Sequence, residues 1–153
     1  MMYLLTQFVL ALFATLAFSV IFRVPVKKIP ACMVVGALGW ITYIIAVHYM
    51  SSPIVGCFAG ACTVGLLSAI CAKVFKEAST VFVIPGILCL VPGYKIYSTM
   101  VELLQEDVTG TAQTGLETLL MAGAIAVGLL VMGIIIGLVR ILVKKVQSLA
   151  AHQ

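Results

Sequence analysis

The chain of 153 residues is 63% hydrophobic and only 9% charged, with a formal net charge of +4. This composition excludes a soluble globular domain and a disordered chain, because so few charges could not cover the apolar surface. It also excludes a nucleic-acid-binding domain, which needs a basic face exposed to water. The sequence therefore predicts an all-α membrane protein with a single transmembrane domain over residues 1–153.

Apolar runs of about 20 residues, enough to cross the hydrocarbon core as a helix, can be placed five times along the chain. The predicted spans cover residues 2–22, 29–49, 53–72, 80–101 and 119–139. The first run has no basic region before it and no small-x-small cleavage site, so we expect it to remain as a span. The stretch V-T-G-T-A-Q-T-G before the fifth run predicts a loop.

Two of these spans carry glycines four residues apart. Gly56 and Gly60 form a G-x-x-x-G pattern in the third span, and Gly133 and Gly137 form another in the fifth. Small residues allow helix backbones to approach closely in lipid, where no hydrophobic driving force holds helices together. We therefore expect both pairs to be helix-packing positions and the third span to be central.

Charged residues sort to opposite sides of this five-span arrangement. One side holds the basic residues Arg23, Lys27, Lys28, Lys73, Lys76, Arg140, Lys144 and Lys145. The other side holds the acidic residues Glu102, Glu106, Asp107 and Glu117. The positive-inside rule then predicts an external N-terminus, a cytoplasmic C-terminus and an external acidic loop. The predicted location is the cell (inner, cytoplasmic) membrane.

The fourth span contains the string V-I-P-G-I-L-C-L-V-P-G-Y-K, with the two pairs Pro85-Gly86 and Pro92-Gly93. Each proline removes a backbone N–H and each glycine adds backbone freedom, so we expect the helix to be interrupted at both pairs. Carbonyl groups that lose their partner are costly in hydrocarbon. Such a segment is therefore expected to be buried in protein or to line a solute path.

Lys95, the last residue of this string, does not fit the charge distribution, because it is a basic residue toward the acidic, external end of the fourth span. If residues 94–107 are helical, a polar stripe at i, i+4, i+7 and i+11 is formed by Lys95, Thr99, Glu102 and Glu106. A polar stripe leading from a broken helix to the external water is typical of a solute path. An ammonium group beside a helix N-terminus favours a carboxylate ligand. The alternative is that Lys95 extends to the outer headgroups and pairs with an acidic group there.

Three other polar or aromatic residues belong to the predicted bundle. Trp40 lies beside glycines of the second span and is expected to pack against another helix or to line the path. Tyr94 lies where an aromatic belt at the membrane interface would place it. Gln7, in the first span, is expected to form an interhelical hydrogen bond.

The sequence contains no motif that supports an enzyme. No nucleotide-binding loop, zinc-protease helix or nucleophile elbow occurs, and the cysteines lack metal-ligand spacing. We therefore expect neither a cofactor nor a metal site. No Asp or Glu falls at the middle of a predicted span. A buried carboxylate that carries protons, if transport uses one, must then come from a partner chain.

The order of motifs resembles that of the threonine/serine exporter family. The resemblance rests on a basic V-P loop, G-A-L-G-W in the second span, and the string P-G-I-L-C-L-V-P-G-Y-K followed by acidic residues. It covers nearly the whole chain and matches the small-subunit half of that family. The matching positions are Pro85, Gly86, Leu90, Val91, Pro92, Gly93 and Tyr94, together with Gly36, Gly39 and Trp40. Cys89 departs from the family string, which often has proline there.

This resemblance implies secondary export from the cytoplasm. It implies threonine and serine as substrates, or dicarboxylates such as succinate in two-component relatives, and a separately encoded large subunit as the partner. Two alternatives remain open from the residues themselves. The chain could be an assembly subunit that braces a larger transporter chain through its G-x-x-x-G faces, or a homo-oligomeric channel that uses the same faces.

Overall fold

The computed structural model describes the backbone of residues 2–150 and the side chains of residues 2–142. Regular structure in this part of the chain is helical throughout. The elements are α1 (Met2–Ile21), η1 (Val26–Lys28), α2 (Ile29–Met50), α3 (Pro53–Phe75), α4 (Thr80–Ile87), η2 (Leu88–Leu90), α5 (Gly93–Leu104) and α6 (Val108–Ala150). The side chains of Lys144 and Lys145, which entered the predicted charge distribution, lie outside the described residues.

Four helical stretches are long and apolar enough to cross a membrane by themselves. They are Met2–Ile21, Val26–Met50, Pro53–Phe75 and Val108–Leu142. The pair Thr80–Leu90 and Gly93–Leu104 would make a fifth crossing if it acts as one bent span. The chain is therefore a multi-pass membrane protein with an all-helical fold.

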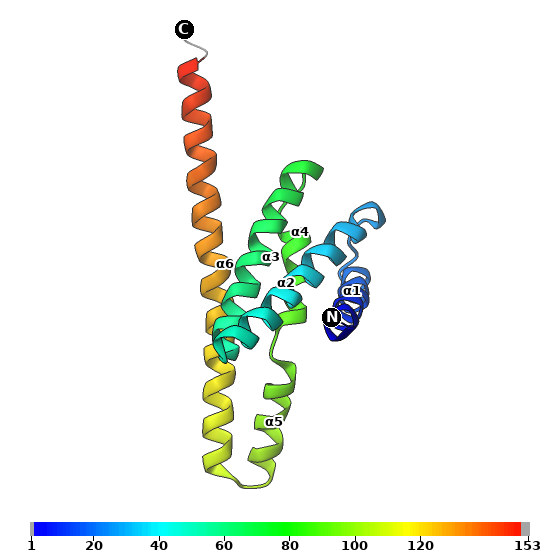
Figure 1. Ribbon diagram of the computed structural model, residues 1–153, viewed down its shortest axis with the longest axis vertical. Coiled ribbons are helices and arrows are strands. Elements are labelled where there is room, and N and C mark those ends of the chain that lie inside the picture. Colours follow the sequence, from blue (N-terminus) through cyan, green and yellow to red (C-terminus); the bar gives the residue numbers. More distant parts are fainter. Residues whose placement is uncertain (1, 151–153) are drawn as a thin grey trace.

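The third span is central to the bundle. One side of α3 packs on α2, which in turn packs on α1, and α3 also contacts α6. The short helix α4 lies against α2 and α3. Figure 1 shows α5 and the first part of α6 as a hairpin that extends beyond the ends of α2 and α3. At the opposite end, an ion pair between Lys28 and Glu77 joins the α1–α2 and α3–α4 connections.

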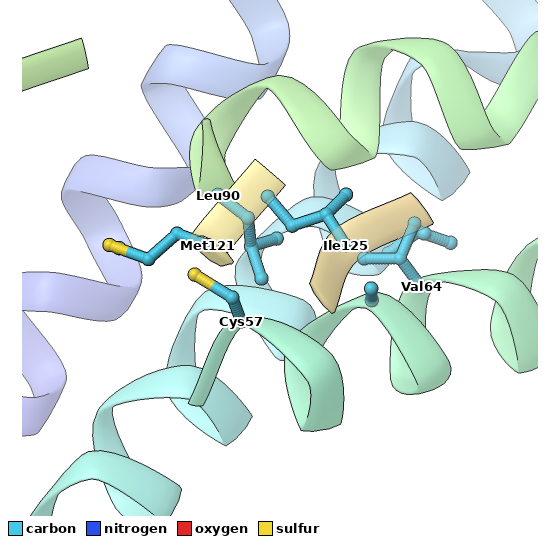
Figure 2. Packing of buried hydrophobic residues seen from close by; sticks show 7 residues of the cluster. Cys57, Val64, Leu90, Met121 and Ile125 are labelled. Atoms are coloured by element: carbon cyan, nitrogen blue, oxygen red, sulfur yellow. The ribbon is translucent and has the colours of Figure 1, made fainter. Parts of the chain in front are cut away.

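The main core lies between α2, α3, η2 and α6. Its buried residues are Val35, Cys57, Ala61, Val64, Leu90, Met121 and Ile125. Figure 2 shows the labelled side chains of this cluster converging, with Leu90 only 2% exposed. Leu90 fits here because two helices present glycine to it: a Cβ added to Gly60 would lie 2.2 Å from Leu90 Cδ2, and one added to Gly39 would lie 3.4 Å from Cδ1.

The two G-x-x-x-G pairs behave differently. A Cβ added to Gly56 would lie 2.5 Å from Val47 Cγ2, and one added to Gly60 would lie 3.0 Å from the carbonyl oxygen of Gly39. These glycines therefore allow α2 and α3 to approach closely. A Cβ added to Gly133 or Gly137 would have no described atom within 4 Å. In the described part of this chain no helix packs closely on this second pair, so its helix-packing role stays a prediction.

The close contact of α6 with α3 occurs at another glycine. A Cβ added to Gly128 would lie 2.9 Å from both Ala61 Cβ and the Phe58 carbonyl oxygen. The Cys62 thiol donates to the Gly128 carbonyl oxygen at 3.7 Å. Gly128 belongs to no G-x-x-x-G pair, so the spacing rule missed it.

Helix α4 continues through Pro85-Gly86, so the predicted interruption at this pair is wrong. Pro85 has no N–H to offer the carbonyl group of Val81 one turn earlier. The thiol of Cys32, on α2, donates to that oxygen at 3.6 Å. Pro85 is fully buried, and the missing hydrogen bond is replaced from the neighbouring helix, which is how membrane helices tolerate proline.

We predict that Cys32→Ala lowers the free energy of unfolding by about 1 kcal/mol, because the Val81 carbonyl group loses its donor. In a Pro85→Ala background the new backbone N–H at position 85 supplies that donor, so the same change should cost measurably less. Denaturant titration in detergent of the four proteins in this double-mutant cycle gives the coupling. Cys57→Ala, at an equally buried cysteine of the main core, is the control and should show no coupling to Pro85. Equal costs in both backgrounds would contradict the assignment.

The chain leaves helical geometry at the second pair, Pro92-Gly93. The turn η2 ends at Leu90, Val91 is extended (φ −60°, ψ 128°), and Pro92 has φ −75° and ψ 60°. The Gly93 N–H donates to the Val91 carbonyl oxygen at 2.7 Å, which closes an inverse γ-turn. The helical segments on either side of this turn are bent by 48°. The predicted span 80–101 is therefore two segments with a hinge-like junction.

Helix α6, which contains the predicted fifth span, begins at Val108, so the loop predicted over residues 108–115 is wrong. Asp107 precedes the helix, and its Oδ1 accepts from the Gly110 N–H at 3.0 Å and from Thr109 Oγ1 at 2.9 Å. These hydrogen bonds, that from the Gly110 N–H first, hold the pKa of Asp107 below its usual value. An Asp that accepts a hydrogen bond from the N–H three residues later is an N-cap, which marks the start of a helix. The Thr- and Gly-rich composition of residues 108–115 led instead to the prediction of a loop.

Candidate functional site

Lys95 lies in the first turn of α5, directly after the junction at Pro92-Gly93. Its Nζ donates to Glu117 Oε2 of α6 at 2.6 Å. The side chains of Lys95 and Glu117 are 34% and 44% exposed, so the ion pair is in contact with solvent. An acidic partner is what the headgroup alternative for Lys95 required, and the structure places that partner on α6.

Of the other residues of the predicted stripe, Glu102 also bonds to α6. Glu102 accepts hydrogen bonds from Thr114 Oγ1 of α6 and from Ser98 Oγ at 3.2 Å. Thr99 donates its hydroxyl proton to the Lys95 carbonyl oxygen at 2.8 Å. Glu106 lies beyond the end of α5 with a positive φ of 61°, so it is not part of the helical stripe. The polar face of α5 therefore holds the hairpin together.

An open pocket of about 210 Å³ lies between the two helices of the hairpin. It is lined by Lys95, Glu102, Gly110, Gln113, Thr114 and Glu117. Three lining residues of α6, Gly110, Gln113 and Thr114, were not predicted as part of a site. Their spacing, 110, 113, 114 and 117, would have indicated a shared helix face, but only if the helix was known to start at residue 108.

The packing of α6 shows where this pocket lies along the length of the bundle. Met121 packs with Cys57 in the main core. Glu117 lies one turn earlier on α6, about 6 Å closer to the tip of the α5–α6 hairpin. Cys57 is itself one turn from Pro53, where α3 begins. The Lys95–Glu117 pair is therefore level with the end of α3. It lies at the edge of the apolar bundle.

Trp40 is not part of this pocket. Its Nε1 donates to Gln7 Oε1 of α1 at 3.1 Å, which confirms the predicted interhelical hydrogen bond of Gln7. The indole ring stacks on Tyr43 with a centroid distance of 5.1 Å. Trp40 thus joins α1 to α2. Tyr94 is 79% exposed and does not line the pocket.

The junction connects the pocket to the core. Leu90, on its inner side, is buried against Gly39 and Gly60, and Lys95, on its outer side, is held by Glu117. A Cβ added to Gly93 would have no described atom within 4 Å. The chain is therefore anchored by an apolar contact before the turn and by an ion pair after it, while the turn itself is open.

Comparison with known proteins gives a family match and matches to several curated proteins. Residues 7–135 match the family model described as "Threonine/Serine exporter, ThrE". A curated protein of Haemophilus influenzae, described as uncharacterized, is 24% identical over 143 residues, which are 88% of this chain and 48% of the relative. The chain thus spans about half the length of that relative. No solved structure shows a significant match.

The matched region includes the second span with Trp40, the string around Pro85 and Pro92, and the Lys95–Glu117 pair. It is an exporter family, in agreement with the apolar helices and with the absence of enzyme motifs from the sequence. The chain belongs to the threonine/serine exporter family.

Proposed function

We propose that this chain is the small subunit of a two-component secondary exporter that moves small carboxylate-bearing metabolites out of the cytoplasm. Threonine, serine and dicarboxylates such as succinate are the candidate substrates. The observation that carries the proposal is the position of Lys95, an ammonium group in the first turn of α5, at the junction between a buried segment and a polar pocket, in a chain of an exporter family.

The chemistry of the pocket supports a carboxylate ligand. The side chain of Lys95 lies beside the N-terminal turn of α5, where no side chain caps the helix. The positive end of the helix dipole and the ammonium group favour the same anion. In this structure the carboxylate of Glu117 occupies that position. A substrate carboxylate would therefore compete with Glu117 for Lys95.

The charges support an orientation with the α5–α6 hairpin outside the cell. The basic connections lie at the end of the bundle opposite this hairpin, so the positive-inside rule places the basic end in the cytoplasm of the cell (inner) membrane. The pocket would then face the outside and act late in export, where the substrate leaves the membrane.

Two observations support a larger second subunit. The relative has about as much chain outside the matched region as inside it, since the match covers 48% of its length. The five Asp and Glu residues of this chain lie in connections or in the hairpin, so none can carry a proton through the apolar core. Both points support a path that further chain of the same family completes, and we propose that a separately encoded large subunit supplies it.

Efflux measurement tests the proposal directly. Cells that lack endogenous exporters are loaded with threonine, serine or succinate, and efflux is followed with this chain, with the large subunit, with both or with neither. We expect efflux above background only with both chains. Unchanged efflux of all three substrates with both chains in the membrane would overturn the proposal. Conductance of this chain alone in liposomes would instead support the homo-oligomeric channel.

A further inference from the structure

A second pocket lies at the basic end of α6, remote from the Lys95 site. It has a volume of about 250 Å³ and is formed by α3, the start of α4 and the second half of α6. Its walls include Gly65 and Ala69 of α3 and Gly133 and Gly137 of α6. Because Gly133 and Gly137 have no described neighbour that an added Cβ would meet, their faces form an open slot.

The two polar side chains of this slot are close to its basic end. Ser79 precedes α4, and Arg140 follows Gly137 by one turn of α6. Among the described side chains no carboxylate forms an ion pair with Arg140. The distance along α6 from Gly133 to Arg140 is seven residues, or about 10 Å. The slot is thus apolar along its length, with an unneutralised guanidinium at one end.

We propose that this slot binds an anionic phospholipid of the surrounding bilayer. One acyl chain lies along Gly133 and Gly137, and the phosphate accepts hydrogen bonds from the Arg140 guanidinium and the Ser79 hydroxyl. Arginine suits phosphate because its planar donors bind two oxygens at once. Basic pockets between membrane helices at the cytoplasmic face are typical sites for acidic headgroups. The site is independent of the Lys95 pocket and of the proposed export.

The surroundings favour a lipid over other occupants. Leu130 and Ile134, on the same part of α6 as the slot, are 65% and 63% exposed, as expected of side chains in contact with lipid. A free carboxylate or phosphate would use Arg140 but leave the apolar slot empty. A helix of another protein that filled the slot would cover Arg140, and a buried charge without a partner is costly. A phospholipid satisfies both the apolar wall and the charge.

Native mass spectrometry of the detergent-purified full chain tests this site. The chain is titrated with dioleoylphosphatidylglycerol or with dioleoylphosphatidylcholine. One basic residue at a membrane surface contributes roughly 1 kcal/mol toward an anionic lipid, so we expect about fivefold tighter binding of the anionic lipid by the wild type. Arg140→Gln should abolish this preference, and Arg140→Lys should keep part of it.

Two further variants make the test specific. Gly137→Leu fills the slot and should weaken binding of both lipids, and Lys27→Gln removes an equal charge from the same end of the bundle and should bind like the wild type. The proposal is overturned if Arg140→Gln keeps the preference or if Lys27→Gln loses it equally. Displacement of the lipid by millimolar succinate or inorganic phosphate would overturn it in favour of a free-anion site. If Gly137→Leu does not fold, the arginine variants decide alone.

Discussion

Gly128→Ala should destabilise the protein, although alanine is the better helix former. The added Cβ would lie 2.9 Å from Ala61 Cβ and from the Phe58 carbonyl oxygen, and neither atom can rotate away. Overpacking of this kind costs about 1–3 kcal/mol, against about 1 kcal/mol gained from helix propensity. We expect a net loss of free energy of unfolding and separation of α6 from α3. The fluorescence of Trp40, the single tryptophan, can follow thermal unfolding in detergent.

Gly123→Ala is the matched control on the same helix. A Cβ at this position would have no described atom within 4 Å, so the change should be neutral or slightly stabilising. A melting temperature that falls equally in both variants would show that the contact at Gly128 does not hold α6 in place. The comparison also tests whether α6 packs on α3 through Gly128 rather than through Gly133 and Gly137.

Lys95→Met and Glu117→Gln should change transport in opposite directions. Both variants remove the ion pair between α5 and α6. If Lys95 binds the substrate carboxylate, Lys95→Met removes a charged hydrogen bond and should weaken apparent affinity about tenfold, the low end for a partly exposed charged group. Glu117→Gln removes the competing carboxylate and should strengthen apparent affinity. Efflux at varied substrate concentration, with both subunits present, measures the two effects.

The opposite signs separate substrate binding from a purely structural role. If the pair only anchors α5 on α6, both variants should loosen the hairpin and lower transport alike. Surface expression and melting temperature of each variant show whether folding accounts for a loss. Equal losses in the two variants would leave Lys95 as an anchor of the hairpin and would remove the main support for a carboxylate path.

The hydropathy of the chain was sufficient to predict its class. A bilayer requires about 20 apolar residues per helical crossing, and it requires that backbone groups be satisfied within the crossing element. Composition and run length therefore decide that this chain is a multi-pass helical membrane protein. The family string around Pro85 and Pro92 is equally local, and for that reason the family was predicted correctly. The hydrogen bond of Gln7 followed from the cost of an unpaired amide in lipid.

The contacts between helices could not be predicted in this way. Spacing rules treated both G-x-x-x-G pairs alike, although among the described residues only Gly56 and Gly60 are in close contact with another helix, and they passed over Gly128. Spacing says which residues share a helix face, and tertiary packing decides what that face meets. In the same way the sequence placed a polar stripe on α5 but could not place Glu117 beside Lys95, because the two residues belong to different helices.

The two Pro-Gly pairs illustrate this division most clearly. By itself the sequence determined that each proline lacks an N–H and leaves a carbonyl group without its usual partner. Only the tertiary structure decided the consequence. At Pro85 the thiol of Cys32 on α2 replaces the missing donor, and the helix continues. At Pro92 the Leu88 carbonyl oxygen receives the Val91 N–H within a tight turn, and the chain bends by 48°. The difference arises because a neighbouring helix supplies the missing donor at Pro85, whereas at Pro92 the chain supplies it itself by leaving helical geometry.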